Sequence, residues 1–329
     1  MKKASKFIMI ILLIFVVGVF SSSVSAQEKV KLTEVVRSIF YAPQYVAMEK
    51  GYFTDEDLEI ELSTAWGGDN AAAALMSNNT DIALVGPEPS IYIYNEGEDN
   101  YIVNFAQLTN TAGSFLVARE PMPDFSWQDL KGKEIIGNRP GGAPQMVLEY
   151  VLTNRNIDIE EDVNLVTNLD FTANPGAFAG GVGDFVQLFE PAASELEQEG
   201  KGYVVASFGE AGGNIPYTVY MARLNYLENN PDIIQGFTDA IGRAQLWVDE
   251  HSAEEIAEVV SSYFPDTEEK IIIKVIERYK DQNTWKVNPM IKKEDFNRYQ
   301  EIMMMAGELE QKIDYIILVD DDFAGGDGE

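Results

Sequence analysis

A regular alternation of short apolar stretches with helical segments is the feature of this sequence that most limits its fold. Near the start, the helical segment 43–50 opens at Pro43, closes at Gly51 and separates two such stretches. Strands arranged in this way favour parallel pairing, so the sequence predicts an α/β fold with mostly parallel sheets and helices on both faces. The strands expected on this basis cover residues 30–36, 58–62, 81–85, 101–108, 114–118, 134–137, 163–169, 184–189, 203–208 and 216–222.

The last third of the chain reads as helical. Apolar residues recur at helical spacing from Ile233 to Val248, and Ser252 with Glu255 forms a capping box for the next helix. Further helices are expected over residues 271–279 and 296–306. Residues 320–329 are rich in glycine and acidic residues without periodicity, which predicts a frayed tail.

Residues 1–26 have the pattern of an export signal. Three lysines precede an apolar run over residues 7–20, which is shorter than the roughly 20 residues that span a bilayer. Val24 and Ala26 stand where a signal peptidase reads the chain. We therefore expect a signal peptide that is cleaved near Ala26, with an uncleaved membrane anchor as the alternative.

The chain is strongly acidic. Its 329 residues include 24 Lys and Arg against 54 Asp and Glu, a net charge of −30 that becomes −33 if the three lysines of the signal are removed. Such a charge repels phosphate backbones and disfavours nucleic acid as a partner. Because the acidic residues are spread over the chain, we interpret them as a hydrated surface and hypothesise adaptation to high salt.

Cysteine is absent and His251 is the sole histidine. This composition excludes disulfides, thiolate metal sites, thiol nucleophiles, a lipid anchor on cysteine and a multi-histidine metal site. We expect neither metal nor cofactor. An exported protein without a lipid anchor would diffuse away unless an outer membrane retained it, so we predict a periplasmic location.

Candidate ligand-binding turns follow four of the predicted strands, where open α/β sheets bind their ligands. They supply backbone N–H groups, glycines for close approach and aromatic or polar side chains. Gly67-Gly68 and Gly141-Gly142 can also be explained as tight turns, and no Gly-Lys-Ser/Thr follows the second pair as a phosphate loop requires. The four turns are residues 40–45, 66–68, 86–90 and 138–145.

Two acidic residues, Glu88 and Glu190, each lie between a predicted strand end and a proline. We expect this position to place both carboxylates at the rim of a cleft. A pair of carboxylates can catalyse glycoside hydrolysis, but these two belong to different units of the chain. His251 lies between acidic helices, far from any elbow turn, so a Ser-His-Asp arrangement is not supported either. The sequence therefore favours a binding protein and not an enzyme.

Several segments resemble the solute-binding proteins of ABC importers. The most specific is Tyr-Ala-Pro-Gln-Tyr-Val-Ala-Met-Glu-Lys-Gly-Tyr-Phe at residues 41–53, and the resemblance covers residues 30–323. More narrowly, it is to the branch of nitrate, taurine, alkanesulfonate and thiamine-pyrimidine-precursor binders (SsuA/THI5-like, NMT1). The other segments that carry it are residues 67–76, 81–88, 129–133 and 189–191.

The resemblance implies a type II periplasmic-binding-protein fold, with two doubly wound lobes joined by a two-strand hinge. Lobe one would comprise residues 27–116 and 217–329 and lobe two residues 117–216, with hinges near 116–118 and 216–219. A monomer of this kind closes on a small-molecule ligand that contacts both lobes. It then delivers the ligand to an ABC permease with its ATPase.

The resemblance also implies a set of ligand-binding residues at the strand-end turns. Sulfonate binders tend to offer neutral donors and helix starts to an anion, whereas Glu88 and Glu190 would favour N–H donors or cations. With the aromatic members of the set, these carboxylates suggest a planar, nitrogen-bearing ligand such as an aminopyrimidine. The alternative is a small anion (alkanesulfonate, taurine or nitrate), which Arg139 favours unless it pairs with Glu88 or Glu190. The set is Tyr41, Gln44, Trp66, Gly67, Glu88, Ser114, Phe115, Arg139, Gly142 and Glu190.

Two rival classes remain to be weighed. Some eukaryotic relatives are enzymes that build the thiamine pyrimidine from their own histidine, with iron and a cysteine-rich motif. This chain has no cysteine, and its histidine lies in the late helical segment, so that class is disfavoured. A sensor domain would need a signalling partner or a downstream membrane segment, for which the sequence gives no sign. A neighbouring permease and ATPase gene pair would distinguish the importer from the sensor.

Overall fold

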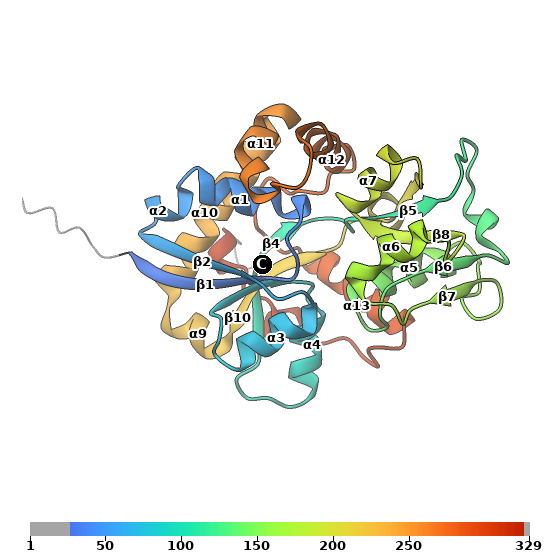
Figure 1. Cartoon of the computed structure of the whole chain (residues 1–329). Coiled ribbons are helices and arrows are strands. Elements are labelled where there is room, and N and C mark those ends of the chain that lie inside the picture. Colours follow the sequence, from blue (N-terminus) through green and yellow to red (C-terminus); the bar gives the residue numbers. More distant parts are fainter. Residues whose placement is uncertain (1–26, 326–329) are drawn as a thin grey trace, which may run out of the picture.

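The computed structural model describes residues 27–325 and contains two five-stranded sheets, each flanked by helices (Figure 1). The first sheet has the order β2–β1–β3–β10–β4. Strand β1 pairs in parallel with β2 and β3, and β10 runs antiparallel between β3 and β4. Its strands are β1 (Glu28–Glu34), β2 (Leu58–Thr64), β3 (Ile82–Val85), β4 (Ile102–Thr109) and β10 (Thr218–Arg223).

The second sheet repeats this pattern with the order β7–β6–β8–β5–β9. Strand β6 pairs in parallel with β7 and β8, and β5 runs antiparallel between β8 and β9. Both sheets are thus mixed, with one antiparallel strand inserted into each. The strands are β5 (Ser114–Ala118), β6 (Glu134–Ile136), β7 (Asn164–Val166), β8 (Phe185–Phe189) and β9 (Tyr203–Ser207).

Helices connect most of the strands and form the C-terminal third, as the alternation in the sequence predicts. We refer to each sheet with the helices packed on it as the first and the second lobe. The α-helices are α1 (Ala42–Glu49), α2 (Tyr52–Asp55), α3 (Gly68–Met76), α4 (Glu88–Asn95), α5 (Ala143–Thr153), α6 (Asn174–Ala179), α7 (Ala192–Gln198), α8 (Phe208–Gly212), α9 (Leu224–Asn229), α10 (Pro231–Glu250), α11 (Ala253–Val260), α12 (Glu269–Asp281), α13 (Lys293–Met305) and α14 (Tyr315–Leu318). Short 3-10 turns lie at η1 (Ile39–Tyr41), η2 (Trp127–Leu130), η3 (Phe171–Ala173), η4 (Ser261–Tyr263) and η5 (Asp322–Ala324).

Helix α10 anchors the core of the first lobe. Pro231 opens the helix, where its missing N–H has no helical partner to lose. The ring of Phe237, fully buried on the apolar face, lies 4.9 Å from that of Tyr220, 5.0 Å from Phe53 and 5.9 Å from Phe105. This aromatic cluster ties the helix to β10 and β4 and so fixes the sheet edge from which the chain crosses to the second lobe.

The chain crosses between the sheets through residues 110–113 and returns through residues 213–217. The two crossovers lie side by side, because Ile215 N–H donates to Asn110 O at 2.9 Å and Tyr217 N–H to Thr109 O at 3.1 Å. All of β5 pairs in the second sheet, so the first crossover precedes the predicted hinge at 116–118. The lobe boundaries that the sequence suggests stay a prediction.

The C-terminal helices contact both lobes, which the sequence did not indicate. Helix α12 packs on α11 of the first lobe and also on α7 of the second. Helix α13 packs on α5 of the second lobe. The region between the lobes therefore carries a third set of contacts besides the two crossovers.

The segment 320–325, predicted as part of a frayed tail, is instead docked. Asp320 N–H donates to Asn104 O at 2.9 Å, and Gln235 Nε2 donates to Phe323 O at 3.1 Å. These partners come from β4 and α10, which a local sequence pattern cannot reveal. Residues 326–329 and the predicted signal peptide at 1–26 lie outside the described residues. Within 27–325, no helix is both long and apolar enough to cross a membrane.

We expect NaCl to stabilise this chain near neutral pH. Between about 0.1 and 1 M salt the Debye length falls from about 10 to about 3 Å, which screens the self-repulsion of a net charge of −30. The midpoint of thermal unfolding at about pH 7.5 should therefore rise over this range. At pH 4.2, near the pI of the chain, the rise should largely vanish. A flat or falling midpoint at neutral pH would contradict adaptation to high salt.

Candidate functional site

A cleft of about 460 Å³ lies between the two lobes. The ends of β1, β3 and β6 and the starts of α3, α4 and α5 reach it, which is the place that ligands occupy in open α/β sheets. Its walls are formed by Val35, Val36, Ser38, Phe40, Tyr41, Trp66, Gly67, Gly68, Asp69, Asn70, Val85, Gly86, Glu88, Asn138, Arg139, Gly142, Ala143, Pro144, Leu169, Asp170, Phe171, Thr172, Phe189, Tyr217 and Thr218.

Glu88 is the buried carboxylate of this cleft, only 5% exposed at the start of α4. Tyr299 Oη donates a hydrogen bond of 2.7 Å to its Oε2. The carboxylate folds back over Gly86, where a Cβ would lie 2.0 Å from Oε2, so only glycine leaves room for it. Burial raises the pKa of the Glu88 carboxyl, although the Tyr299 hydrogen bond and the charge of Arg139 oppose this.

Aromatic rings form much of the remaining wall. Phe40 lies 6.0 Å from Phe189 and 5.8 Å from Tyr217 between ring centroids, so these rings from both lobes make one packed surface. Trp66 and Phe171 are 64% and 44% exposed, one on each lobe. Large rings left open to solvent beside a cleft can stack on a planar ligand.

Besides a hydrogen bond of 3.2 Å from Ser38 Oγ to Glu190 O, two polar contacts connect the lobes at the cleft. Arg139 Nη2 lies 2.7 Å from Asp69 Oδ1, and Tyr92 Oη donates to Gly141 O at 3.0 Å. The partner of Arg139 is thus Asp69, and the pairing with Glu88 or Glu190 considered from the sequence does not occur. Both members of the Arg139–Asp69 pair are at least half exposed, so water competes for them and a ligand can displace one of them.

The structure brings six of the predicted site residues together on the cleft wall and places four elsewhere. Gln44 is buried below the cleft, where its amide donates to Glu34 Oε2 at 2.9 Å and accepts from Tyr220 Oη at 3.1 Å. Ser114 Oγ accepts a hydrogen bond from Gln187 at 2.9 Å. The residues on the wall are Tyr41, Trp66, Gly67, Glu88, Arg139 and Gly142.

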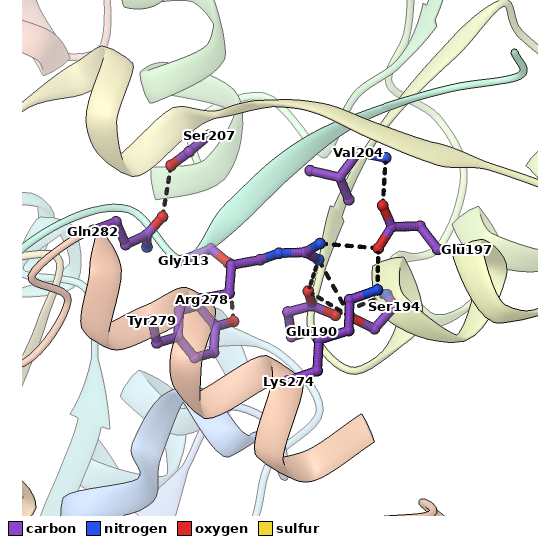
Figure 2. A network of polar contacts seen from close by, with 10 residues as sticks. All are labelled: Gly113, Glu190, Ser194, Glu197, Val204, Ser207, Lys274, Arg278, Tyr279 and Gln282. Carbon is purple, nitrogen blue, oxygen red and sulfur yellow. Dashed lines mark hydrogen bonds and ion pairs between the residues drawn. The ribbon is translucent and has the colours of Figure 1, made fainter. Parts of the chain in front are cut away.

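Neither Phe115 nor Glu190 lines the cleft, and both lie next to Arg278 of helix α12, as Figure 2 shows for Glu190. The guanidinium of Arg278 is 5.3 Å from the centroid of the Phe115 ring. The Glu190 side chain is fully buried and paired with Arg278. Of the two carboxylates expected to face the cleft, only Glu88 does so. Glu190 instead pairs with Arg278, which lies 88 residues further along the chain.

Sequence reasoning missed several residues of the cleft. Asn138 opens one of the four predicted turns, so its position was a usable signal, whereas Phe171 and Phe189 carry no local pattern that separates them from core. Tyr217 is the last residue of the second crossover, directly before β10. Asn138 Oδ1 and Tyr217 Oη are both buried and have no hydrogen-bond partner among the described residues. No group of three or more His, Asp or Glu side chains within 27–325 could hold a metal ion.

Comparison with known proteins agrees with this architecture. The family model "NMT1/THI5 like" matches residues 39–255. The chain is 48% identical over 296 residues to the putative binding protein YtlA of Bacillus subtilis, covering 90% of this chain and 89% of that protein. It is 24% identical over 250 residues to the nitrate/nitrite binding protein NrtA of Nostoc, covering 67% and 54% of the two chains.

Solved structures show the same fold at lower sequence identity. The alkanesulfonate-binding protein SsuA of Xanthomonas axonopodis, bound to MOPS, superposes with a TM-score of 0.71 at 15% identity, covering 90% of this chain and all of that one. The mixed, two-lobed architecture of this chain is therefore the periplasmic-binding-protein fold that the sequence predicts. Together with the family model and the 48% identical relative, this shows that the chain belongs to the NMT1/THI5-like family.

Proposed function

We propose that this chain is the extracytoplasmic solute-binding subunit of an ABC importer. A cleft between two lobes, in a chain of this family, is the observation that supports the proposal. In this role the chain is exported by a cleaved signal, is retained in a periplasm and passes its ligand to a permease with its ATPase. It does not transform the ligand, and rotation of the lobes around it produces the closed form.

For the ligand we favour a small planar compound that carries N–H groups, such as an aminopyrimidine. Glu88 offers a carboxylate oxygen in the cleft, and carboxylates bind N–H donors strongly. Trp66 and Phe171 offer rings that can stack on both faces of a flat molecule. A tetrahedral sulfonate would use neither feature.

The orientation of the Asn138 side-chain amide supports the same ligand class. Pro144 O can only accept, so the Gln187 amide must donate to it at 3.0 Å through Nε2. Gln187 Oε1 then accepts from Asn138 Nδ2 at 2.9 Å, which leaves Asn138 Oδ1 as an unpaired acceptor. A ligand N–H that reaches this oxygen would satisfy it, whereas an anion could not.

A small anion is the second candidate. The starts of α3 and α5 reach the cleft, and helix N-termini carry partial positive charge. Arg139 would add a full positive charge if the anion displaced Asp69. The relative NrtA is named as a nitrate/nitrite binder and SsuA as an alkanesulfonate binder.

Calorimetry on the exported form distinguishes the two candidates. We expect binding heat with aminopyrimidines and none with taurine or nitrate at matched concentrations. A response to the anions alone would contradict the N–H-bearing ligand and leave the importer role intact. Small-angle scattering should show a more compact chain with whichever ligand binds. An unchanged shape across a broad panel, or chemical turnover of any compound, would contradict the solute-binding role itself.

A further inference from the structure

A cluster of charged side chains joins the two lobes away from the cleft (Figure 2). Its centre is Arg278, near the end of α12, whose helix packs on α11 in the first lobe. The two carboxylates that Arg278 contacts, Glu190 and Glu197, come from the end of β8 and from α7 in the second lobe. The cluster therefore connects the lobes by charge, and none of these side chains lines the ligand cleft.

The two terminal nitrogens of the Arg278 guanidinium each bind one of the two carboxylates. Arg278 Nη1 contacts Glu190 Oε1, and Nη2 lies 2.9 Å from Glu197 Oε2. Lys274, one turn earlier on α12, adds a second ion pair of 2.8 Å to the same Glu197 oxygen. Arginine can satisfy two carboxylates in fixed geometry because its donors are arranged in a rigid plane.

Both carboxylates are oriented by the second lobe. Glu190 accepts from Ser194 N–H at 2.9 Å and from Ser194 Oγ at 3.0 Å, and Glu197 Oε1 accepts from Val204 N–H at 3.0 Å. The Glu190 side chain is fully buried, and that of Glu197 is 19% exposed. The acceptors are thus preorganised, so each hydrogen bond to Arg278 costs little further ordering.

The charges in the cluster are stabilised by one another. Burial acts to lower the pKa of Arg278, but Glu190 and Glu197 outweigh it and the net shift is upward. Burial likewise acts to raise the pKa of Glu197, yet Lys274 and Arg278 bring it below its ordinary value. Arg278 and Glu197 therefore remain charged at neutral pH.

Residues at the end of α12 and just after it also form hydrogen bonds with the first crossover. Tyr279 Oη donates to Gly113 O at 3.0 Å (Figure 2), and Gln282 Nε2, just past the helix, donates to Ala112 O at 3.2 Å. The backbone of residue 110 adds a hydrogen bond of 2.6 Å to Thr284 O. These contacts hold the crossover itself, whereas Glu197 belongs to α7, which packs on β8 and β9 of the second lobe. Rotation of the lobes must therefore lengthen or shorten the distance from Arg278 to Glu197.

We propose that Arg278 and Glu197 form an interlobe brace. The brace sets the equilibrium between different arrangements of the two lobes, and thereby how readily the lobes close on a ligand. The brace favours the arrangement of the lobes drawn in Figure 1, because Glu197 forms its ion pairs with Lys274 and Arg278 in this arrangement. Because these charged pairs are partly exposed, their loss together should shift the ratio by about tenfold. The inference depends on the proposed function only in taking lobe rotation as the step that a ligand drives.

The test measures the distance between the lobes in the full mature chain without any ligand. The chain has no cysteine, so Asn79→Cys and Glu160→Cys, both exposed and one on each lobe, accept spin labels uniquely. In this background we compare the parent with Glu197→Gln, which retains the shape of the side chain. Arg278→Lys is the second variant, since a point charge cannot grip both carboxylates. Glu301→Gln is the matched control, because it removes an ion pair of 2.6 Å to Lys312 within the C-terminal segment.

We expect both brace variants to shift the ratio of the label distances by about tenfold and the control to leave it unchanged. About 1 M NaCl should move the parent in the same direction as Glu197→Gln, because salt screens the partly exposed pairs. Equal distance distributions in all variants would overturn the proposal. A lower unfolding midpoint with an unchanged distribution would also overturn it, since the cluster would then be a structural ion pair alone. Either result leaves the solute-binding role to its own calorimetric test.

Discussion

Replacing Glu34 with alanine should lower the free energy of unfolding by about 3–5 kcal/mol, since it removes a fully buried charge from its partners. Glu34 ends β1, and each of its oxygens accepts two hydrogen bonds. Oε1 accepts from Arg37 at 2.7 Å and Thr64 at 3.0 Å, and Oε2 from Tyr45 at 2.8 Å and Gln44 at 2.9 Å. Without the carboxylate, Tyr45 and Gln44, both fully buried, lose their acceptor in a place that water cannot reach.

Glu61→Ala is the control for this loss. Glu61 lies on the neighbouring strand β2 and pairs with Lys29 at 3.0 Å, but both side chains are more than 40% exposed. Its removal should change the free energy of unfolding by less than about 1 kcal/mol. Urea unfolding followed by far-UV circular dichroism measures both variants. Equal losses for Glu34→Ala and Glu61→Ala would show that the Glu34 cluster does not contribute to stability as its burial implies.

Replacing Glu88 with glutamine should weaken binding of an aminopyrimidine by about 10- to 100-fold, because a charged acceptor becomes a neutral one. Tyr299 can still donate to the amide oxygen, so the cleft should retain its shape. Asp170→Asn removes an exposed carboxylate from the same wall and should change the affinity less than about threefold. Calorimetry measures both. Unchanged affinity in Glu88→Gln would show that its carboxylate does not contact the ligand.

The same variant has an expected pH signature in stability. The pKa of Glu88 is raised by burial, so the folded chain retains this proton more tightly than the unfolded chain. Its contribution to stability is complete below the ordinary pKa and is lost as the pH rises through the folded pKa. Glu88→Gln has no proton to lose. Its free energy of unfolding relative to the parent should therefore increase from about pH 4.5 upward, with a slope of at most about 1.4 kcal/mol per pH unit, and level off above the folded pKa. A constant difference from pH 4 to 8 would contradict the raised pKa.

The positions of the strands along the chain and the turns at their ends were predictable because their signals are local, whereas the antiparallel insertion of β10 and β5 into sheets expected to be mostly parallel was not. Runs of β-branched and apolar residues mark the strands, and Gly86-Pro87 marks the turn that places Glu88 in the cleft. Parallel pairing then brings the turns after β1 and β3 to the same edge of the first sheet, and the turn after β6 reaches the same cleft from the second sheet.

Residues whose role depends on a distant partner were not predictable in this way. Glu190 resembles Glu88 in its local sequence, yet Arg278 and Ser194 draw it into a buried ion pair away from the cleft. Gln44 lies in the expected turn but is engaged by Glu34 and Tyr220. In both cases the outcome is decided by contacts that appear only when helices and strands from separate parts of the chain are packed together.

The place of β10 in the first sheet limits how early that sheet can form while the chain is being synthesised. Strand β10 separates β3 from β4, although every strand of the second sheet precedes it in the sequence. Until residue 223 has emerged from the ribosome, β4 has no neighbour on the side that β10 will occupy. The first sheet of the nascent polypeptide therefore cannot be completed before residue 223 is available, whereas the second sheet lies within one continuous stretch, residues 114–207.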